Sequence, residues 1–368
     1  MQTDRVKFPR DKDVEFTKTL NARVNAYFKD NGISKHANAT MVIKTLVILA
    51  AHLIPLGLML FGFTTTPIGV LFSYTIMGFA IAGIGMAVMH DANHGAYSTN
   101  QSVNDYVGYL INLVGGSAEN WKVQHNILHH TYTNIEGLDA DITTFPMLRF
   151  SPFAKRRAVH RFQHIYAWFF YGLMTVSWVF MKDFKQLVDY HYSGMTKSYT
   201  KGFGVVIARV LLLKAVYFTI TLALPIILLP VAWYVTVAGF FFMHFIGGVI
   251  LGMVFQAAHI MEVCDYPLPD NNGKMNDSWI VHQLRTTTNF APHNQVLNWY
   301  VGGLNYQVEH HLFPRICHVH YPNIAPIVQS TCRQYGIPYQ SIPTFVGAVL
   351  GHGSMLRALG RKEQMAVA

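Results

Sequence analysis

Four long apolar runs set the strongest limit on what this chain can fold into. The runs cover residues 41–63, 67–89, 205–229 and 231–257, and few charged side chains interrupt them. Each is long enough to cross a hydrocarbon core of about 30 Å as a helix. The polar stretches between them hold nearly every Lys, Arg, Asp and Glu. This alternation is typical of a polytopic membrane protein, and the alternative is a set of helices buried in a large soluble core.

The four runs are predicted to form two transmembrane hairpins. The uncharged turn at residues 64–66 joins the first two runs, and Leu229 and Pro230 join the last two. A fifth apolar stretch, residues 162–181, starts with polar residues and is rich in Trp, Tyr and Phe, so we expect it to lie in the membrane interface. An even number of crossings then brings the early and late histidine clusters to one membrane face. Arg209 and Lys214 are expected near the cytoplasmic end of their helix.

The predicted fold class is therefore an all-α integral membrane protein with interfacial helices and a cytosolic helical cap. Residues 1–40 and 326–368 are expected to be cytosolic segments on either side of a membrane domain at 41–325. The net charge of +9 lies in the polar segments, which the positive-inside rule places in the cytoplasm with both termini. These segments lack the basic and aromatic interleaving of a nucleic-acid surface, so no nucleic-acid partner is expected. The first forty residues are polar and charged, so no cleavable secretory signal is expected, and the three cysteines lack the spacing of a disulfide or thiolate metal site.

Histidines are the most informative polar residues of the chain, which has 19 of them. Two pairs have a four-residue spacing that puts both rings on one helix face, and one pair is followed directly by another histidine. A third group places a glutamine four residues before the last of two adjacent histidines. The three groups are His90 and His94; His125, His129 and His130; and Gln307, His310 and His311.

The histidine groups predict a site for two metal ions. His259 lies at the end of the last apolar run, on the same membrane face as the other groups, and we interpret it as a further ligand. The number of histidines in these groups exceeds the three or four protein ligands that one zinc ion needs. Imidazole suits zinc, copper, iron and nickel, so the ligand type alone does not name the metal. Neither a cysteine cluster nor an ExxH motif is present, which argues against iron–sulfur and carboxylate di-iron sites.

In these motifs the sequence resembles the membrane fatty acyl desaturases, whose three histidine boxes read HxxxH, HxxxHH and (H/Q)xxHH. The resemblance covers about residues 40–325, and it implies a di-iron centre that uses O2 to introduce a double bond into an acyl chain. Iron and O2 are expected because an unactivated methylene C–H bond needs an oxidant that no side chain provides. By position, the resemblance implies nine metal-binding residues: His90, His94, His125, His129, His130, His259, Gln307, His310 and His311.

The third box is similar to that of front-end desaturases, which act between an existing double bond and the carboxyl end. The similarity lies in Gln307 and in the run QVEHHLFP at residues 307–314. Many front-end enzymes carry a fused b-type cytochrome domain with an HPGG haem motif, which this sequence lacks. A separate electron-transfer protein, either a ferredoxin or a b-type cytochrome, is therefore expected, with a fatty acyl-lipid or acyl-CoA as substrate.

Four carboxylates in or near the boxes are predicted to accept the second ring N–H of metal-bound histidines, a role preferred here over general-base catalysis. They are Asp91, Asp139, Asp141 and Glu309. The amide of Gln307 is a poorer ligand than imidazole, so it could instead orient water or substrate.

Two other functions compete with desaturation. A hydroxylase or other oxygenase could use the same metal core, because a substrate carbon radical can lose a second hydrogen or recapture oxygen. A metal transporter would place ionisable residues inside the spans, near the midplane. Within the spans, His52 and His244 are the notable histidines, and packing roles suffice for them. Desaturation is therefore the favoured interpretation.

Overall fold

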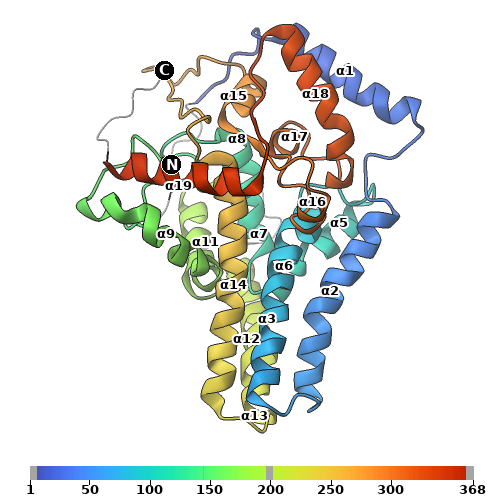
Figure 1. Ribbon diagram of the computed structural model, residues 1–368, viewed down its shortest axis with the longest axis vertical. Coiled ribbons are helices and arrows are strands. Elements are labelled where there is room, and N and C mark those ends of the chain that lie inside the picture. Colours follow the sequence, from blue (N-terminus) through green and yellow to red (C-terminus); the bar gives the residue numbers. More distant parts are fainter. Residues whose placement is uncertain (1–5, 144, 196–201, 362–368) are drawn as a thin grey trace.

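The chain forms a membrane stem beneath a larger helical cap (Figure 1). The computed structural model describes residues 6–143, 145–195 and 202–361. Four continuous helical stretches in these ranges are long and apolar enough to cross a membrane, by length and composition. They are α2 (Ala39–Leu60); α3 (Pro67–Gly83) with η2 (Ile84–Val88) and α4 (Met89–Asn93); α12 (Phe203–Phe218) with η7 (Thr219–Ala223) and α13 (Leu224–Leu228); and α14 (Trp233–His259).

Local capping signals start the first hairpin. The Asn38 side chain accepts a hydrogen bond from Met41 N at 3.1 Å, which satisfies one of the free N–H groups at the start of α2. Thr66 caps α3 in the same way, and Pro67 follows in the first helical turn, where its missing N–H costs nothing. Both hairpin turns carry no charge and lie at the end of the stem away from the cap (Figure 1).

Close packing of α3 against α14 forms the centre of the stem. A Cβ at Gly78 would lie 2.7 Å from Met243 O, and a Cβ at Gly239 would clash with the Tyr74 ring. Small residues at these positions let the two backbones approach closely, as in many membrane helix pairs. Each of these helical stretches leads to a histidine at the cap end, His90 on α4 and His259 at the end of α14.

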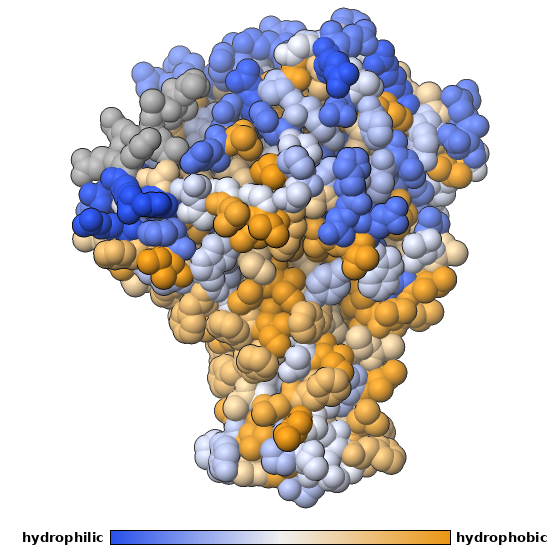
Figure 2. Space-filling view, in the orientation of Figure 1, coloured by the Kyte–Doolittle hydropathy of each residue, from blue (hydrophilic) through white to orange (hydrophobic). Residues whose placement is uncertain are grey.

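The outer surface of the stem is apolar. Figure 2 shows hydrophobic residues over the lower part of the molecule and hydrophilic residues over the cap. Ile68 is 80% exposed, Phe72 64% and Leu212 63%, which an aqueous surface would not favour. Together with the four spans, this surface confirms the predicted all-helical membrane fold.

The cap contains the remaining helices and one small parallel strand pair. The first and last helices, α1 and α19, both lie on the cap side (Figure 1). In chain order the cap elements are α1 (Val14–Asp30), α5 (Gln101–Gly108), α6 (Leu110–Leu113), α7 (Ala118–Trp121), η3 (Lys122–His129), α8 (His130–Tyr132), η4 (Ala158–Phe162), α9 (Gln163–Gly172), α10 (Met174–Ser177), η5 (Trp178–Lys182), α11 (Asp183–Tyr192), α15 (Trp279–Thr286), β1 (Asn289–Phe290), α16 (Gln295–Tyr300), α17 (Gln307–Leu312), η8 (His318–His320), α18 (Tyr321–Tyr335), β2 (Ser341–Ile342) and α19 (Phe345–Arg361).

The fifth apolar stretch does not form one straight span. Residues 163–182 divide into α9, α10 and η5, with a break at Leu173, and they are not among the candidate membrane spans. Two basic residues of α12 bind carboxylates of the cap. Arg209 Nη1 lies 2.7 Å from Glu119, and buried Lys214 Nζ lies 2.8 Å from Asp183. These ion pairs fasten the third span to the cap.

Candidate metal centre

The three histidine groups and His259 meet where the stem joins the cap. The first group lies on α4 and its C-cap, the second on η3 and α8, and the third on α17, while His259 ends α14. Eight of the nine predicted metal-binding residues are buried, and His94 is partly exposed. The structure therefore brings all the predicted ligand positions to one site.

The donor atoms form two adjacent clusters. Cluster A has four histidines whose donor atoms all lie within 4.8 Å of one another, and cluster B has three that meet the same limit. His130 lies between them: its Nε2 is 3.2 Å from His125 Nε2 and 3.0 Å from His310 Nε2, and its ring stacks on His311. Cluster A is His90, His94, His125 and His310; cluster B is His129, His259 and His311.

A π-helical turn explains how the second box serves both clusters. Residues Lys122–His129 form a π-helix, so the α-helical spacing assumed for this box was wrong in detail. The rings of His125 and His129 stack with centroids 5.2 Å apart, although they belong to different clusters. The wider i→i+5 turn also places His130 over His125. Such π turns in helices frequently mark functional sites.

The arrangement of ring nitrogens fits metal ions. Two nitrogens bound to one metal at about 2.1 Å and at right angles lie roughly 3 Å apart. His90 Nε2 lies 3.1 Å from His125 Nε2, close to that separation. The buried Nε2 atoms of His94, His129 and His311 have no hydrogen-bond partner in the described chain. Buried nitrogens without partners are costly, and a metal ion would satisfy them.

Burial keeps most of these imidazoles neutral, which is the form that binds metal. It lowers the pKa of His125, His130, His310 and His311 well below the ordinary value, and neighbouring histidines lower it further. His129 differs. Burial lowers its pKa, but the carboxylates of Asp139 and Asp141 outweigh this and raise it. The two carboxylates thus supply negative charge next to cluster B.

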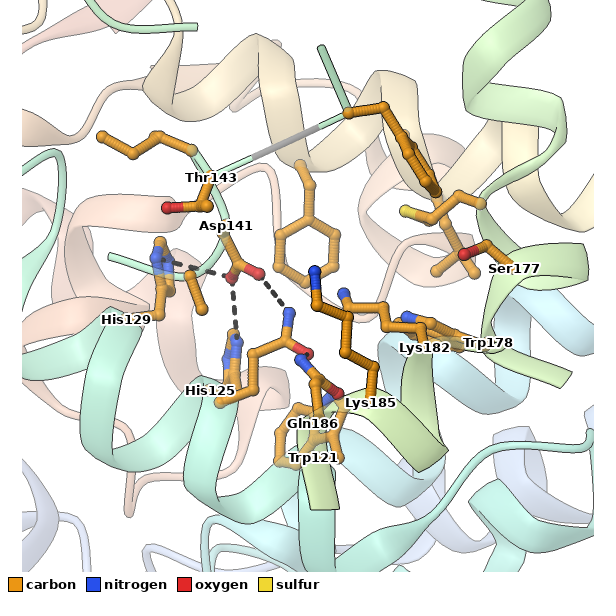
Figure 3. A pocket seen from close by; sticks show the side chains of 18 of the residues that line it. Trp121, His125, His129, Asp141, Thr143, Ser177, Trp178, Lys182, Lys185 and Gln186 are labelled. Atoms are coloured by element: carbon orange, nitrogen blue, oxygen red, sulfur yellow. Dashed lines mark hydrogen bonds and ion pairs between the residues drawn. The ribbon is translucent and has the colours of Figure 1, made fainter. Parts of the chain in front are cut away.

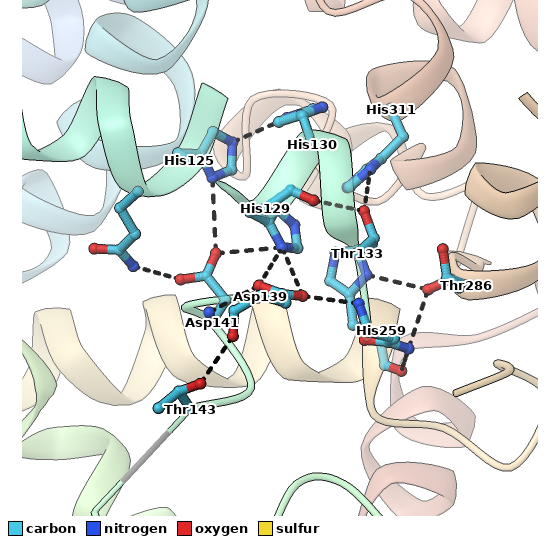
Figure 4. Close-up of polar contacts among 12 residues, drawn as sticks. His125, His129, His130, Thr133, Asp139, Asp141, Thr143, His259, Thr286 and His311 are labelled. Carbon is cyan, nitrogen blue, oxygen red and sulfur yellow. Dashed lines mark hydrogen bonds and ion pairs between the residues drawn. The ribbon is translucent and has the colours of Figure 1, made fainter. Parts of the chain in front are cut away.

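Asp139 and Asp141 occupy the predicted place behind the histidine rings. The two carboxylate oxygens of Asp139 lie 3.1 and 3.2 Å from His129 Nδ1, and Asp141 Oδ2 lies 3.5 Å from the same atom (Figure 4). Asp141 Oδ2 also lies 3.9 Å from His125 Nδ1. Backbone N–H groups of Asn134 and Asp141 donate to Asp139 at 2.9 and 2.8 Å, which fixes its orientation.

Two polar residues that the sequence analysis missed support His311. Its Nδ1 lies 2.8 Å from Gln283 Oε1, and the Thr133 hydroxyl donates to the same Gln283 oxygen at 2.9 Å. Gln283 lies on α15, far from any histidine box in sequence, so no local pattern marks it.

The main hydrogen-bond partner of Asp91 lies far from it in the sequence. Its Oδ2 accepts hydrogen bonds from His318 N at 3.0 Å and from His318 Nδ1 at 2.8 Å, whereas Oδ1 lies 3.8 Å from His90 Nδ1. His318 Nε2 is in turn 2.6 Å from Lys44 Nζ on α2. The structure thus places a buried Lys44–His318–Asp91 chain beside cluster A, and neither Lys44 nor His318 was predicted to take part.

Glu309 differs from the prediction. Its carboxylate accepts hydrogen bonds from Asn289 Nδ2 and Tyr339 OH, both at 2.8 Å, and forms no hydrogen bond with a histidine ring of the described residues. Burial raises the pKa of Glu309 to about 7, although both hydrogen bonds oppose this shift. On α17 the backbone turns this side chain away from the metal site, toward the strand pair. Glu309 therefore supports the fold around the third box.

Gln307 lies inside the site. Its Nε2 is 2.9 Å from His259 Nε2, and its Oε1 has no hydrogen-bond partner in the described chain. The amide oxygen is the atom that a metal or a bound water would use, so the geometry fits either of the two roles considered for this residue.

A cavity of about 820 Å³ opens beside the clusters. His125, His129 and His259 contribute to its wall, so it reaches ring atoms of both clusters. Figure 3 shows part of the polar lining, with Asp141 beside the two histidines and lysine side chains opposite. The rest of the lining is largely apolar and includes Gly85 of η2, Met174 of α10, and Leu251 and Phe255 of α14. Such a cavity suits a long apolar substrate with a polar end.

Fold and site together define a membrane protein with a buried histidine-rich centre that can bind metal, next to an apolar cavity. Comparison with known proteins identifies the protein family. The family profile described as "Fatty acid desaturase" matches residues 64–343, and the chain belongs to that family.

Several characterised desaturases are similar over almost the whole chain. An sn-1 linoleoyl-lipid 6-desaturase of Arthrospira platensis is 38% identical over 95% of this chain and 93% of that protein. A protein of the same description from Synechocystis sp. is 34% identical over 98% of this chain and 99% of that protein. An acyl-lipid (8-3)-desaturase of Physcomitrium patens is 32% identical over 95% of this chain and 72% of that protein. These findings confirm the predicted fatty acyl desaturase and support the front-end type, so the transporter alternative is set aside.

Proposed function

We propose that this desaturase binds two iron ions through its histidine clusters and introduces a double bond on the carboxyl side of an existing one, in an acyl chain carried by a glycerolipid. The observation that carries the proposal is the presence of two adjacent clusters of buried ring nitrogens at the wall of one largely apolar cavity.

Cluster A would hold one iron and cluster B the other. His130 lies within reach of both clusters, and Gln307 supplies an amide oxygen next to His259. Imidazole is a suitable ligand for iron, and burial favours the neutral form of the rings that a metal requires. Asp139, Asp141 and Gln283 would fix the orientation of the cluster B rings through their second nitrogens.

The substrate class rests on two supports. The cavity has apolar walls for an acyl chain and a polar part for its head. The similar proteins from Arthrospira and Synechocystis are described as linoleoyl-lipid 6-desaturases, which modify an acyl group on a lipid. We therefore propose an acyl-lipid bearing a linoleoyl-type chain over acyl-CoA.

The metals would supply the oxidising chemistry, and the chain supplies position and exclusion of water. In the overall reaction the acyl chain loses two hydrogen atoms, and O2 takes these with two electrons and two protons to form two water molecules. The electrons are proposed to come from a separate one-electron carrier, a ferredoxin or a b-type cytochrome. The protein walls around the cavity hold two neighbouring methylene groups near the clusters.

We further propose that the cap, with both terminal helices, faces the cytoplasm. The turns at the far end of the stem carry no charge, whereas the cap carries most of the excess of Lys and Arg. Positively charged segments are retained on the cytoplasmic side of membranes. A soluble electron carrier would then reach the cap directly.

The test is to express the chain in a host supplied with linoleic acid and to analyse the lipids by gas chromatography with mass spectrometry. The wild type should form a new double bond on the carboxyl side of those already present. His129→Ala should abolish the product, and the matched control His293→Ala, at an exposed histidine outside the site, should retain it.

Iron analysis of the purified protein completes the test. Two iron ions per chain in the wild type are expected, with fewer in His129→Ala. Hydroxylated products would replace the proposal with the oxygenase alternative. Full activity of His129→Ala, or another metal in active protein, would contradict the proposed centre.

A further inference from the structure

Two lysines enter the cavity from one helical segment. Lys182 ends η5 and Lys185 lies one turn later on α11, and both line the cavity. Figure 3 shows both side chains extending into the cavity from this segment, toward Asp141. Neither ammonium group forms an ion pair or hydrogen bond with another residue of the described chain. The Lys182 ammonium group lies over the Trp178 ring, 5.5 Å from the ring centroid.

Two of the carboxylates near the lysines are engaged elsewhere, and Asp189 of α11 also lines the cavity. Asp183, the next residue to Lys182, forms a buried ion pair with Lys214 at 2.8 Å. Asp141 accepts a hydrogen bond from the Gln124 amide and lies next to the histidine rings. Burial lowers the pKa of Lys182, and Asp141 and Asp183 oppose that effect. A buried charge is costly without a partner, so a lysine that points into a partly enclosed cavity is a candidate for binding a ligand.

The lysines lie only a few side chains from the metal site. Gln186, one residue after Lys185, donates to Gln124 Oε1 at 2.8 Å, and Gln124 donates to Asp141. Asp141 in turn lies 3.5 Å from His129 Nδ1. The polar part of the cavity is therefore adjacent to the histidine clusters. An acyl chain whose carbonyl end is held here presents methylenes close to that end to the metals, and its remaining length can lie along the apolar lining.

We propose that Lys182 and Lys185 bind the oxygen atoms at the head of the acyl substrate, and that this anchor makes the enzyme count from the carboxyl end. Lys182, which is less exposed, donates to the acyl carbonyl oxygen, and Lys185, at the exposed rim, donates to oxygens of the headgroup. The inference rests on the proposed desaturase function, because it names the residues that position that substrate. The same oxygen acceptors occur in a glycerolipid ester and in an acyl-CoA thioester.

The first test is substrate binding to the iron-loaded protein without a reductant, so that no turnover occurs. A fluorescent linoleoyl glycerolipid and linoleoyl-CoA serve as separate probes. Lys182→Met should weaken binding roughly tenfold or more, as expected for loss of a hydrogen bond to a charged group, and Lys182→Arg should largely restore it. Lys185→Met should have a smaller effect. The control Lys18→Met, at an exposed lysine of α1, should bind like the wild type.

The second test is the position of the new double bond during turnover. Lys182→Met should produce a mixture of positions where the wild type produces one, with unchanged iron content. In the binding test, a weaker affinity for the glycerolipid alone assigns the lysines to its ester and headgroup. A weaker affinity for acyl-CoA alone assigns them to the thioester. An equal loss of affinity for both probes assigns them to the shared carbonyl.

Wild-type affinity and wild-type regiochemistry in Lys182→Met would overturn the inference. An inactive wild type whose lipid binding still depends on Lys182 would instead count against the proposed reaction and leave the lysine site standing. The two failures are therefore distinguishable.

Discussion

The two histidine clusters are supported in different ways by the residues behind them. In cluster B, His129 has carboxylate oxygens at 3.1 and 3.2 Å from its Nδ1, and His311 has an amide oxygen at 2.8 Å. In cluster A the corresponding contacts are longer, 3.8 Å from His90 to Asp91 and 3.4 Å from His310 to the Tyr321 hydroxyl. Rings with close partners are held in one orientation, so cluster B is the better preorganised half.

Loss of a ring from the supported cluster should have the largest effect. His311→Ala removes a donor from cluster B and leaves the Gln283 oxygen without its ring partner. We expect no detectable desaturation and loss of about one iron per chain. His94→Ala, in the loosely supported cluster, should leave more iron bound. Metal analysis of both purified variants checks this, and equal iron loss would remove the distinction between the clusters.

The next largest effect is expected from Asp139→Asn. The substitution keeps the shape of the side chain but removes the charge that orients His129. Loss of a partner of this kind typically costs roughly 10–100-fold in metal affinity or activity. Iron release to a chelator, followed over time, should be faster than in the wild type. An unchanged release rate would show that Asp139 only fixes the loop through Asn134 and Asp141.

A smaller loss of activity, about tenfold, is expected for Asp91→Asn. Asp91 Oδ1 lies 3.8 Å from His90 Nδ1, which is further than Asp139 lies from His129. The same substitution leaves His318 and Lys44 without their carboxylate, so it should lower the thermal unfolding temperature more than Asp139→Asn does. Thermal unfolding and turnover of both variants test the contrast. The opposite order in both measurements would contradict it.

The smallest effect is expected for Glu309→Gln. Glu309 contacts Asn289 and Tyr339 and is oriented away from both clusters. The amide can still hydrogen-bond to both partners after a local adjustment, so activity should change by less than about twofold, in line with substitutions that leave the site untouched. Turnover and iron content provide the measurement. A loss comparable to that of Asp139→Asn would mean that Glu309 acts on the centre through His310.

The sequence allowed the spans, their pairing and the histidine groups that meet at the candidate site to be predicted, because hydrophobic length and residue spacing are local properties. The supporting residues were harder. Asp139 and Asp141 follow the second box closely and were found, but Gln283, His318 and Lys44 lie far from their partners in sequence. Glu309 was misassigned because its place inside a box says nothing of the direction of its side chain. The π turn of η3 was also missed, since spacing was interpreted with α-helical geometry.

The packing of α3 against α14 links the lipid bilayer to the chemistry. The helical stretch that starts with α3 leads to His90 of cluster A, and α14 leads to His259 of cluster B. Their separation is set deep in the stem, where Gly78 and Gly239 leave no room for a larger residue. A change in lateral pressure or hydrocarbon thickness that altered how these two helices cross would therefore also move His90 relative to His259. Membrane composition would then act on the geometry of the histidine clusters through the stem.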